Sequence, residues 1–532
     1  MLAHTRILQK WYPAFFLDYL NNREQAQRMF PHSPDEKGFE ECANRLRNAN
    51  MPPDLGKLLQ KQNTKCGSLQ PAFDQIKKIS RPGCLTVITG QQAGLMGGPL
   101  YVTYKVIRAI HLAKDLEILL DRPVVPIYWV ETNDSNFNDI NRVNYTDGSG
   151  ELRALAFAPD RTQDLCIGRT RITDQIQSVL NDYFNTVRKT EFSESLRELL
   201  FECYRTGDRW NAAAMKLAAR LYTGLGAVVF DPSDPEYVDW IQPVLKKECT
   251  DLRDASEQAL EEKTGQLVQS GYKRQVDKED RRLNVFLLDN GCRKALFYTD
   301  AGIADREGNS VDIPTARLLP NVLTRSLCQD SVFATVAFVA GPSETAYLGM
   351  LDGLYRVHGL NMPVVVPRYT GTLIDSKVSG VVGKLNADPE MFILNDRDRV
   401  VHEVFRESAD INLDELNEQL ETASDGFLDD ISRMLPESGD QEIAKEMKML
   451  SKTLRKGLGK VTGKIRRREK QRKDVQIARA GRIANELLPD GMLQERSLNI
   501  FQYMNLYGGV SFLKNLSETL DQSAEGHNLW KI

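Results

Sequence analysis

The stretch that most constrains the fold is PGCLTVITGQQAGLMGGPLYVTYK, residues 82–105. Its first part, Cys84–Thr89, is a short apolar and β-branched run, which indicates a buried strand. A glycine-rich turn follows, formed by Gly90, Gly94, Gly97 and Gly98. Pro99 then precedes a helix-like run. Because strand, glycine turn and helix in this order begin an α/β nucleotide-binding unit, we expect an α/β fold.

The glycine turn has two interpretations. Glycines let backbone N–H groups approach a phosphate, and the start of the next helix adds a favourable dipole. Gly90, Gly94 and Gly98 are therefore predicted to bind a nucleotide. The spacing matches neither G-x-G-x-x-G nor the GK[ST] loop, so a tight structural turn is about as plausible from spacing alone. Gln91 and Gln92 favour the binding site, because paired amides at a turn suit polar recognition better than packing.

Further strands follow the first at spacings that suit a parallel sheet. Pro123–Val130 begins far enough after the turn for one crossover helix. Buried strands are also predicted at Gly226–Asp231, Thr335–Ala340 and Pro363–Pro367. This alternation across 84–368 predicts a mostly parallel sheet with two insertions. A smaller antiparallel element is expected from strands at Gly271–Val276 and Asn284–Tyr298, with turns at Asp289–Gly291 and Ala301–Gly308.

Polar residues follow several of these strands. Ligands of open parallel sheets bind beyond the carboxyl ends of the strands. Glu131, Asp134, Asn136 and Asp139 would lie there beside the glycine turn, although a solvated loop with a helix cap is an equal alternative. The turn at Gly341–Glu344 belongs to the same edge of the sheet.

A second polar set surrounds the strand at 335–340. Asn321, Arg325, Gln329 and Asp330 precede it, and Glu344 and Tyr347 begin the helix after it. An arginine so placed can clamp a carboxylate or phosphate through two nitrogens. The alternative is an Arg–Asp pair that ties a loop to the sheet. Arg368 stands at the carboxyl end of the last strand.

The domain organisation is read from changes in pattern. We predict a helical segment over 1–81, a Rossmann-like core over 82–375 with insertions at about 150–225 and 232–318, and a connector over 376–409. Apolar residues spaced by three and four then predict helices Leu413–Met434 and Ile443–Ile465, turned at Pro436–Gly439, within a coiled-coil hairpin over 410–488. Residues 489–532, with a helix at Leu493–Tyr507, would pack on the core.

Composition excludes several classes. The net charge of −4 gives no general reason to expect nucleic acid, and the basic run at 464–473 lacks interleaved aromatics. No run of about 18 apolar residues exists, so we expect no membrane helix. Eight scattered cysteines without a C-x-x-C favour reduced thiols in the cytoplasm. Six histidines without an H-x-x-x-H argue against a zinc site of local spacing, and no metal ligands are predicted.

Four segments carry a resemblance to a known family. They are TGQQAGL…GPLY…K at 89–105, PNVLTRSLCQD at 320–330, VAGPSETAY at 339–347 and LLPDGMLQERSLN at 487–499. In these the chain resembles the bacillithiol-biosynthesis cysteine-adding family, the cysteine ligases called BshC. The resemblance implies a core similar to class I aminoacyl-tRNA synthetases and a coiled coil used in homodimerisation. It also implies ATP or another adenine nucleotide, with Mg²⁺, and the addition of cysteine to glucosaminyl-malate as the last step towards bacillithiol.

Site roles follow from this resemblance. Gln91, Gln92, Lys105 and Asp134 are predicted to be catalytic, and Gly90, Gly94, Gly98 and Gly341 to bind the nucleotide. Lys105 and Arg368 would neutralise phosphate charge, Asp134 would anchor the cysteine amine, and Arg325 or Arg496 would hold the malate carboxylates. The predicted substrate-binding residues are Tyr101, Asn136, Arg325, Gln329, Asp330, Glu344, Tyr347, Arg368 and Arg496. If the Lys105 side chain faces solvent, its loss should change stability little.

The sequence also departs from the family. Asn133–Phe137 replaces a family pattern like E-D-H-D-F, and Tyr104 stands where a histidine often precedes the family lysine. Both imidazoles, which are the usual proton carriers, are therefore missing. A ligase for another amine, or a non-catalytic nucleotide- or metabolite-binding scaffold that assembles through its coiled coil, are the alternatives. A tRNA-charging role ranks lower, because the chain has no evident anticodon-binding domain.

Overall fold

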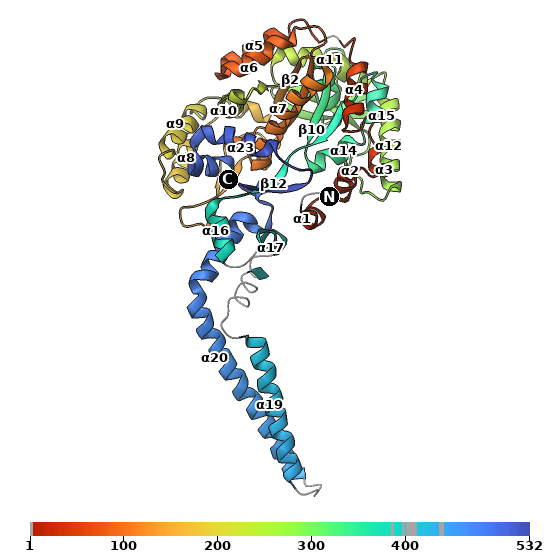
Figure 1. The fold of residues 1–532 in the computed structure, drawn as a ribbon. Coiled ribbons are helices and arrows are strands. Elements are labelled where there is room, and N and C mark those ends of the chain that lie inside the picture. Colours follow the sequence, from red (N-terminus) through yellow and green to blue (C-terminus); the bar gives the residue numbers. More distant parts are fainter. Residues whose placement is uncertain (1–3, 50, 385–387, 396–398, 401–411, 436–440) are drawn as a thin grey trace. The chain divides into compact units, whose positions relative to one another are not determined.

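The computed structural model describes residues 4–49, 51–384, 388–395, 399–400, 412–435 and 441–532. The chain divides into two compact units (Figure 1). The first unit contains residues 1–373 and 492–532, and the second contains residues 374–491.

A five-stranded parallel sheet with the order β11-β10-β1-β2-β5 forms the centre of the first unit. Its strands are β1 Leu85–Gln92, β2 Val124–Glu131, β5 Val228–Phe230, β10 Thr335–Ala340 and β11 Val364–Pro367. The predicted α/β class and parallel sheet are confirmed. One boundary was wrong: residues 90–92 continue β1 instead of turning, and Gly90 and Gln92 pair with Trp129 and Glu131 of β2.

Helices cover both faces of this sheet, because successive residues of a buried strand point to opposite sides. Leu85 and Val87 of β1 pack with Leu112 of α7 (Leu100–Leu120) and with α4 (Glu36–Arg45). On the other face, Ile88 and Trp129 pack in a cluster with side chains of α5, α6 and α11. These three helices span Leu55–Cys66, Gln70–Ile79 and Pro235–Cys249.

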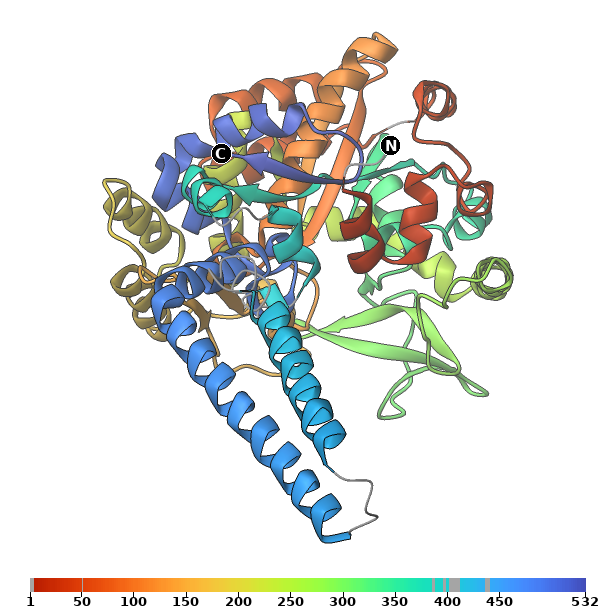
Figure 2. The same cartoon turned by 60° about the horizontal axis from the view of Figure 1, so that its bottom comes forward.

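The other elements of the first unit surround this core. Before the sheet come α1 Thr5–Trp11, α2 Ala14–Leu20 and α3 Glu24–Gln27. Between β2 and β5 lie the antiparallel pair β3 Arg142–Thr146 and β4 Leu152–Ala156, then α8 Gln175–Thr186, α9 Ser193–Cys203 and α10 Trp210–Tyr222. After β5 come α12 Arg253–Gln269 and an antiparallel sheet, β8-β7-β6-β9, of β6 Arg282–Asp289, β7 Cys292–Thr299, β8 Gly302–Asp305 and β9 Leu318–Pro320. Figure 2 shows this sheet in yellow-green.

The remaining helices and strands of the first unit flank β10 and β11 or close the chain. They are α13 Arg325–Asp330, α14 Pro342–Leu348, α15 Asp352–Val357, α21 Gln494–Ser497, α22 Ile500–Tyr507 and α23 Phe512–Asp521. Strand β12 Thr370–Ile374, which begins in the first unit, pairs with β13 His527–Lys531. Single 3₁₀ turns are η1 Leu95–Gly97, η2 Phe137–Asp139, η3 Ile167–Arg169, η4 Thr223–Leu225, η5 Pro489–Gly491 (in the second unit) and η6 Gly509–Ser511.

Three local predictions were wrong. Gly271–Val276 is not a strand, and β8 occupies part of the turn expected at 301–308. The single helix expected at 493–507 is two helices, because Leu498 is extended and the Asn499 side chain caps α22 by accepting from Phe501 N at 2.9 Å.

The second unit contains the predicted helical hairpin. Its helices are α16 Ser376–Lys384, α17 Pro389–Leu394, α19 Leu413–Met434 and α20 Gln441–Leu487. Helices α19 and α20 lie side by side (Figures 1 and 2). The side chain of Asn412 caps α19, and Arg455 of α20 contacts Asp425 of α19 at 3.2 Å. The turn predicted at Pro436–Gly439 lies outside the described residues.

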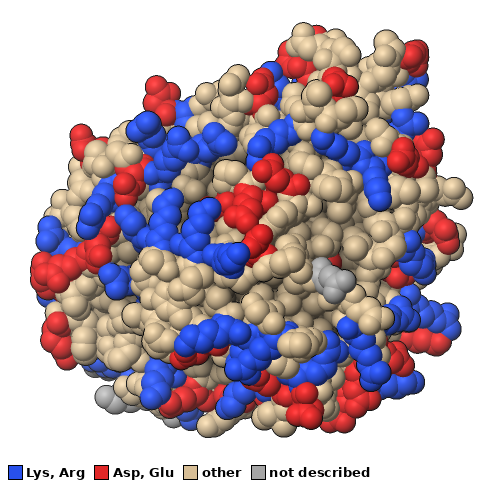
Figure 3. Space-filling model, turned by 90° about the horizontal axis from the view of Figure 1, so that it is seen from above, with Lys and Arg blue, Asp and Glu red and all other residues tan. Residues whose placement is uncertain are grey.

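Two surface features bear on the expected partners. Among the helices in the described part of the chain, none is long and apolar enough to cross a membrane. On the face drawn in Figure 3, lysines and arginines are interspersed with acidic residues over most of the surface.

Candidate functional site

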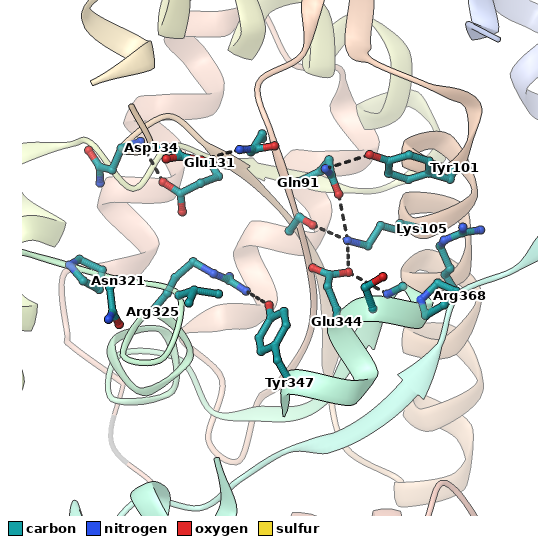
Figure 4. A pocket seen from close by; sticks show the side chains of 18 of the residues that line it. Gln91, Tyr101, Lys105, Glu131, Asp134, Asn321, Arg325, Glu344, Tyr347 and Arg368 are labelled. Carbon is teal, nitrogen blue, oxygen red and sulfur yellow. Dashed lines mark hydrogen bonds and ion pairs between the residues drawn. The ribbon is translucent and has the colours of Figure 1, made fainter. Parts of the chain in front are cut away.

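A cavity of about 380 Å³ opens at the carboxyl ends of β1, β2, β10 and β11 (Figure 4). Predicted site residues that line it are Gly90, Gln91, Gln92, Tyr101, Lys105, Asp134, Arg325, Gly341, Glu344, Tyr347, Arg368 and Arg496. They come from six separate sequence segments: 90–105, 134, 325, 341–347, 368 and 496. The topology brings them together because the carboxyl ends of parallel strands share one edge of the sheet.

Lys105, on α7, is held entirely by the protein. Its Nζ donates to Gly90 O at 2.7 Å and to Gln91 Oε1 at 3.1 Å, and it pairs with Glu344 Oε2 at 2.5 Å. An ammonium has three donors, so all of them are used. The side chain is only 1% exposed, so the condition that Lys105 faces solvent is not met. Burial lowers the pKa of Lys105, and the charge of Glu344 opposes that shift.

Glu344 links this lysine to the start of α14. Its carboxylate also accepts from Gly341 N at 2.7 Å, at the N-cap of the helix. Burial alone would raise the pKa of Glu344, but Lys105 and the Gly341 N–H outweigh it and hold this pKa below its usual value. Glu344 is therefore a fixed carboxylate whose charge is already compensated.

Asp134 is paired with an arginine that sequence reasoning missed. Arg293 Nη1 of β7 contacts Asp134 Oδ1 at 2.8 Å, and Gln92 Nε2 donates to the other oxygen. Burial would raise the pKa of Asp134, but Arg293 and Gln92 lower it. Nothing in the local sequence marks Arg293. Only its position in the inserted sheet, where Nη2 also donates to Pro320 O at 3.2 Å, directs it to the cavity.

Arg368 is likewise engaged by the protein. Its Nη2 contacts Glu495 at 2.6 Å, and its Nη1 donates to Tyr369 O at 2.7 Å. Glu495, on α21, is fully buried and also accepts from Gly371 N and from the Tyr12 hydroxyl. The neighbouring Arg496 instead is exposed and lines the cavity. Residues 494–496 therefore supply both structural groups and a cavity side chain.

Two lining groups inside the cavity, Arg325 and Glu131, are less engaged. Arg325 Nη1 is buried and has no hydrogen-bond partner among the described residues, while Nη2 lies 3.5 Å from the Tyr347 hydroxyl. Burial would lower the pKa of Arg325, but the charges of Tyr347, Glu131 and Glu344 raise it. The carboxylate of Glu131, at the end of β2, accepts only from Trp129 Nε1 and Asn133 N in the part of the chain that the structure describes.

Five predicted residues lie outside the cavity: Gly94, Gly98, Asn136, Gln329 and Asp330. Gln329 and Asp330 face the core, where Gln329 Nε2 donates to Asp330 at 2.8 Å and the Tyr355 hydroxyl donates to its other oxygen. Burial raises the pKa of Asp330 to about 6. Asn136 is exposed and donates to Asp139. The alternative Arg325–Asp330 ion pair is not formed in the described structure.

The glycine turn itself is structural. Its N–H groups donate to protein acceptors: Ala93 to Glu131, Gly94 to Gln92, Leu95 to Ile140, Met96 to the Tyr204 hydroxyl, Gly97 to Gly94 and Gly98 to Leu95. Asn499 Nδ2 bonds Met96 O and Gly98 O at 2.9 and 2.6 Å. A Cβ on Gly94 would lie 2.9 Å from Gly98 Cα. The N–H groups of residues 93–98 are therefore all engaged, and this turn offers none of them to a phosphate.

Two further points concern this cavity: the position of the family histidine and the ligands for a metal ion. Tyr104 is buried and contacts Trp530 edge to face, so the position of the family histidine beside Lys105 does not line the cavity. Among the described residues, no group of three or more His, Cys, Asp or Glu side chains is arranged to hold a metal ion.

Comparison with known proteins identifies the family. A model described as "Bacillithiol biosynthesis BshC, N-terminal Rossmann-like domain" matches residues 2–369, and its "C-terminal coiled-coil domain" counterpart matches residues 371–532. The chain belongs to the BshC family. Both matches agree with the Rossmann-like sheet of the first unit and the α19–α20 hairpin of the second.

Members of the BshC family resemble this chain over nearly its whole length. A "Putative cysteine ligase BshC" of Salinibacter ruber is 26% identical over 535 residues, which cover 97% of this chain and 96% of the relative. One from Natranaerobius thermophilus is 29% identical and covers 95% of both chains. A solved structure titled as a putative arginyl-tRNA synthetase from Campylobacter jejuni gives a TM-score of only 0.23 at 11% identity, covering 89% of this chain and 99% of its own. The closer likeness to class I synthetases stays a prediction.

Proposed function

We propose that the protein is a cysteine ligase that forms an amide between cysteine and the amine of glucosaminyl-malate, the last step towards bacillithiol. Membership of the BshC family and the names of its relatives support this activity. The observation that carries it is the cavity itself. Five cationic and three anionic side chains line it: Lys105, Arg293, Arg325, Arg368 and Arg496, and Glu131, Asp134 and Glu344. Such a site suits small, charged, polar substrates.

The chain's own groups would act mainly by fixed charge and position. The Lys105–Glu344 and Arg293–Asp134 pairs are held in place before a substrate arrives, so they need not reorganise during the reaction. Arg496 has no side-chain partner among the described residues and would bind an anionic group, either a malate carboxylate of the acceptor or a phosphate. No histidine stands among the described residues that line the cavity.

ATP, when bound, would supply the activation of the cysteine carboxylate in this proposal. Its phosphates do not fit the glycine turn, whose amides are taken. Lys105 has no free donor, and both terminal nitrogens of Arg368 are engaged. The side chain that best fits a phosphate is therefore Arg496. No residue is assigned to Mg²⁺.

The test uses the purified full chain with cysteine, glucosaminyl-malate, ATP and Mg²⁺. The expected result is a cysteine-dependent product with the mass of the amide, formed together with one nucleotide product. Arg496→Gln should raise the KM of the acceptor or of ATP about tenfold or more, and the substrate affected identifies the anion that Arg496 binds. Arg317→Gln is the matched control, because Arg317 is an exposed arginine outside this cavity that pairs with Asp239 at 2.9 Å.

A negative outcome would be equally informative. Nucleotide binding without any cysteine-dependent product, with glucosaminyl-malate or other amines as acceptors, would replace the ligase with the non-catalytic scaffold. Product formed only with another amine would keep the ligase and change its acceptor.

The proposal includes a homodimer formed through the helical hairpin in the cytoplasm. Exposed apolar side chains on α19 and α20, at Phe427, Met434, Met449 and Val461, support a partner surface there. All eight cysteines are free thiols, which supports a reducing compartment. Sedimentation of Phe427→Glu as a monomer, where the unaltered chain sediments as a dimer, is the expected result. An unaltered chain that is monomeric at micromolar concentration would contradict it.

A further inference from the structure

Most charges that line the cavity are already compensated by the protein. The compensated pairs are Lys105–Glu344, Arg293–Asp134 and Arg368–Glu495, at 2.5, 2.8 and 2.6 Å. Apart from the exposed Arg496, two charged side chains then remain without an ion-pair partner in the described part of the chain. They are the carboxylate of Glu131 and the guanidinium of Arg325. One is negative and one is positive, and both line the same cavity.

Glu131 is fixed in position without being neutralised. Its Oε2 accepts from Trp129 Nε1 at 2.9 Å, and its Oε1 accepts from Asn133 N at 2.8 Å. Both donors are neutral, and each carboxylate oxygen keeps a further lone pair. Trp129 is only 1% exposed, so the indole that holds the carboxylate is itself held by the core. The carboxylate is therefore held in position to bind a cation, and the described residues do not supply one.

Arg325 is the complementary case. It begins α13, and its guanidinium lies over the Phe338 ring with 5.5 Å between Cζ and the ring centroid. Nη1 is buried without a partner among the described residues. Leaving a buried charged donor unsatisfied is costly, so such a group in a native structure needs an explanation. A ligand oxygen at Nη1 explains it.

Glu131 and Arg325 do not approach each other. No nitrogen of Arg325 lies within 4.0 Å of the Glu131 carboxylate, although the two charges influence each other. Gly90 helps to keep the space beside Arg325 open. A Cβ at this position would lie 3.3 Å from Arg325 Nη1 and 3.6 Å from Trp129 Cβ. The absence of a side chain here keeps space beside Arg325 Nη1 in the cavity that Glu131 also lines.

We propose that Glu131 and Arg325 form the binding site for the head group of a zwitterionic α-amino acid. Glu131 takes the ammonium and Arg325 Nη1 takes one carboxylate oxygen, which leaves the second oxygen open to the cavity. An α-amino acid carries its ammonium and its carboxylate on the same carbon, so one head group can meet two opposite charges that line one cavity. The identification of this amino acid as cysteine rests on the proposed ligase function.

Two competing assignments fit less well. Asp134, predicted to anchor the amine, is already paired with Arg293 and accepts from Gln92. A phosphate at Arg325 would place a dianion beside the carboxylates of Glu131 and Glu344, both of which act on Arg325. A zwitterion instead adds no net charge and meets both free charges at once.

The test is ligand binding by calorimetry on the full chain without nucleotide, so that no turnover is needed. Three ligands are compared under reducing conditions: cysteine, 3-mercaptopropionate, which lacks the ammonium, and cysteamine, which lacks the carboxylate. The unaltered protein should bind cysteine at least about tenfold more tightly than either analogue.

The variants then separate the two charges. Glu131→Gln should bind cysteine and 3-mercaptopropionate about equally while still discriminating against cysteamine. Arg325→Gln should show the reverse pattern. A purely structural role for either residue would weaken all three ligands alike. Arg317→Gln is the control and should keep both discriminations.

The assignment would be overturned by cysteine binding in both variants as tight as in the unaltered protein, or by equal binding of all three ligands by the unaltered protein. The proposed function fails separately. Normal discrimination without amide product would leave this site standing and remove the ligase. Normal ligase activity in both variants would keep the ligase and remove this site. If the protein distinguished cysteine from its two analogues only when the amino-sugar acceptor is present, Glu131 and Arg325 would be assigned to the acceptor site.

Discussion

The cavity wall and the polar layer behind it come from the same sequence motifs but differ in how their polar groups are used. The cavity wall, here Glu131, Arg325 and Arg496, has charges without ion-pair partners among the described residues. In the supporting layer, here Asp330, Glu495 and Asn499, the last two side chains are buried and Asp330 is half-buried, and all three are satisfied by protein partners. Arg325 and Asp330 share α13, and Glu495 and Arg496 are adjacent.

This difference teaches that a motif is not a site. A stretch of polar residues can direct one side chain to a ligand and the next into the core, because neighbours on a helix point in different directions. The supporting layer should therefore govern stability, while the wall governs binding.

The largest contrast is expected between adjacent residues of α21. Glu495→Ala removes the partner of Arg368 and leaves a buried, uncompensated cation, so stability should fall by about 3–5 kcal/mol. Arg496→Ala should change stability by no more than about 0.5 kcal/mol, because that side chain is exposed. Urea unfolding of both variants measures the difference. Equal losses of unfolding free energy in the two variants would contradict the distinction between the cavity wall and the supporting layer.

Lys105 lines the cavity but should behave as part of the supporting layer. Lys105→Ala leaves the half-buried Glu344 without its cation and removes a buried side chain, and we expect a loss of about 3–4 kcal/mol in unfolding free energy. Adding Glu344→Gln to this variant should recover part of the loss, since the orphaned charge is then gone. A single variant as stable as the unaltered chain would show that Lys105 belongs to the wall.

Asp330 should make stability depend on pH. Its folded pKa of about 6 lies above the ordinary value of 3.8, so between these values the folded state holds a proton that the unfolded state has lost. Stability from this group should therefore fall as pH rises from about 4 to 6, by about 3 kcal/mol in all, and stay constant above. The difference between the unaltered chain and Asp330→Asn, followed by urea unfolding across this range, isolates the slope. A difference independent of pH would contradict the prediction.

The smallest effect is expected at the glycine turn. Asn499→Ala leaves Met96 O and Gly98 O without their side-chain donor, which should cost about 1–3 kcal/mol. Asn136→Ala is the matched control, because this asparagine is exposed and should change stability by less than about 0.5 kcal/mol. Thermal unfolding and cysteine binding are measured together. If Asn499→Ala weakened the free energy of cysteine binding by more than it lowered the free energy of unfolding, the glycine turn would be part of the cavity wall.

Much of the fold was predictable because its signals are local. The buried strands at 335–340 and 364–367 are continuous apolar runs, and the hairpin helix at 413–434 repeats apolar residues every three or four positions. Helix α20 extends past the predicted end at 465 to Leu487, and burial of Ala480, Ile483 and Leu487 supports its last turns. The strand end at 90–92 was taken for a turn, because glycine is a turn signal that pairing with β2 overrides.

The sequence by itself determined the family, the α/β class and which segments meet at the carboxyl edge of the sheet. It determined these because strand periodicity and motif order are properties of the chain alone. Only the tertiary structure decided which motif residues reach the cavity. Arg293 reaches the cavity from an inserted strand that is distant in the sequence. The ammonium of Lys105 forms an ion pair with Glu344 and is not available to a ligand. The backbone amides of the glycine turn donate to protein acceptors. A side chain's availability depends on partners that fold beside it, and no local pattern records them.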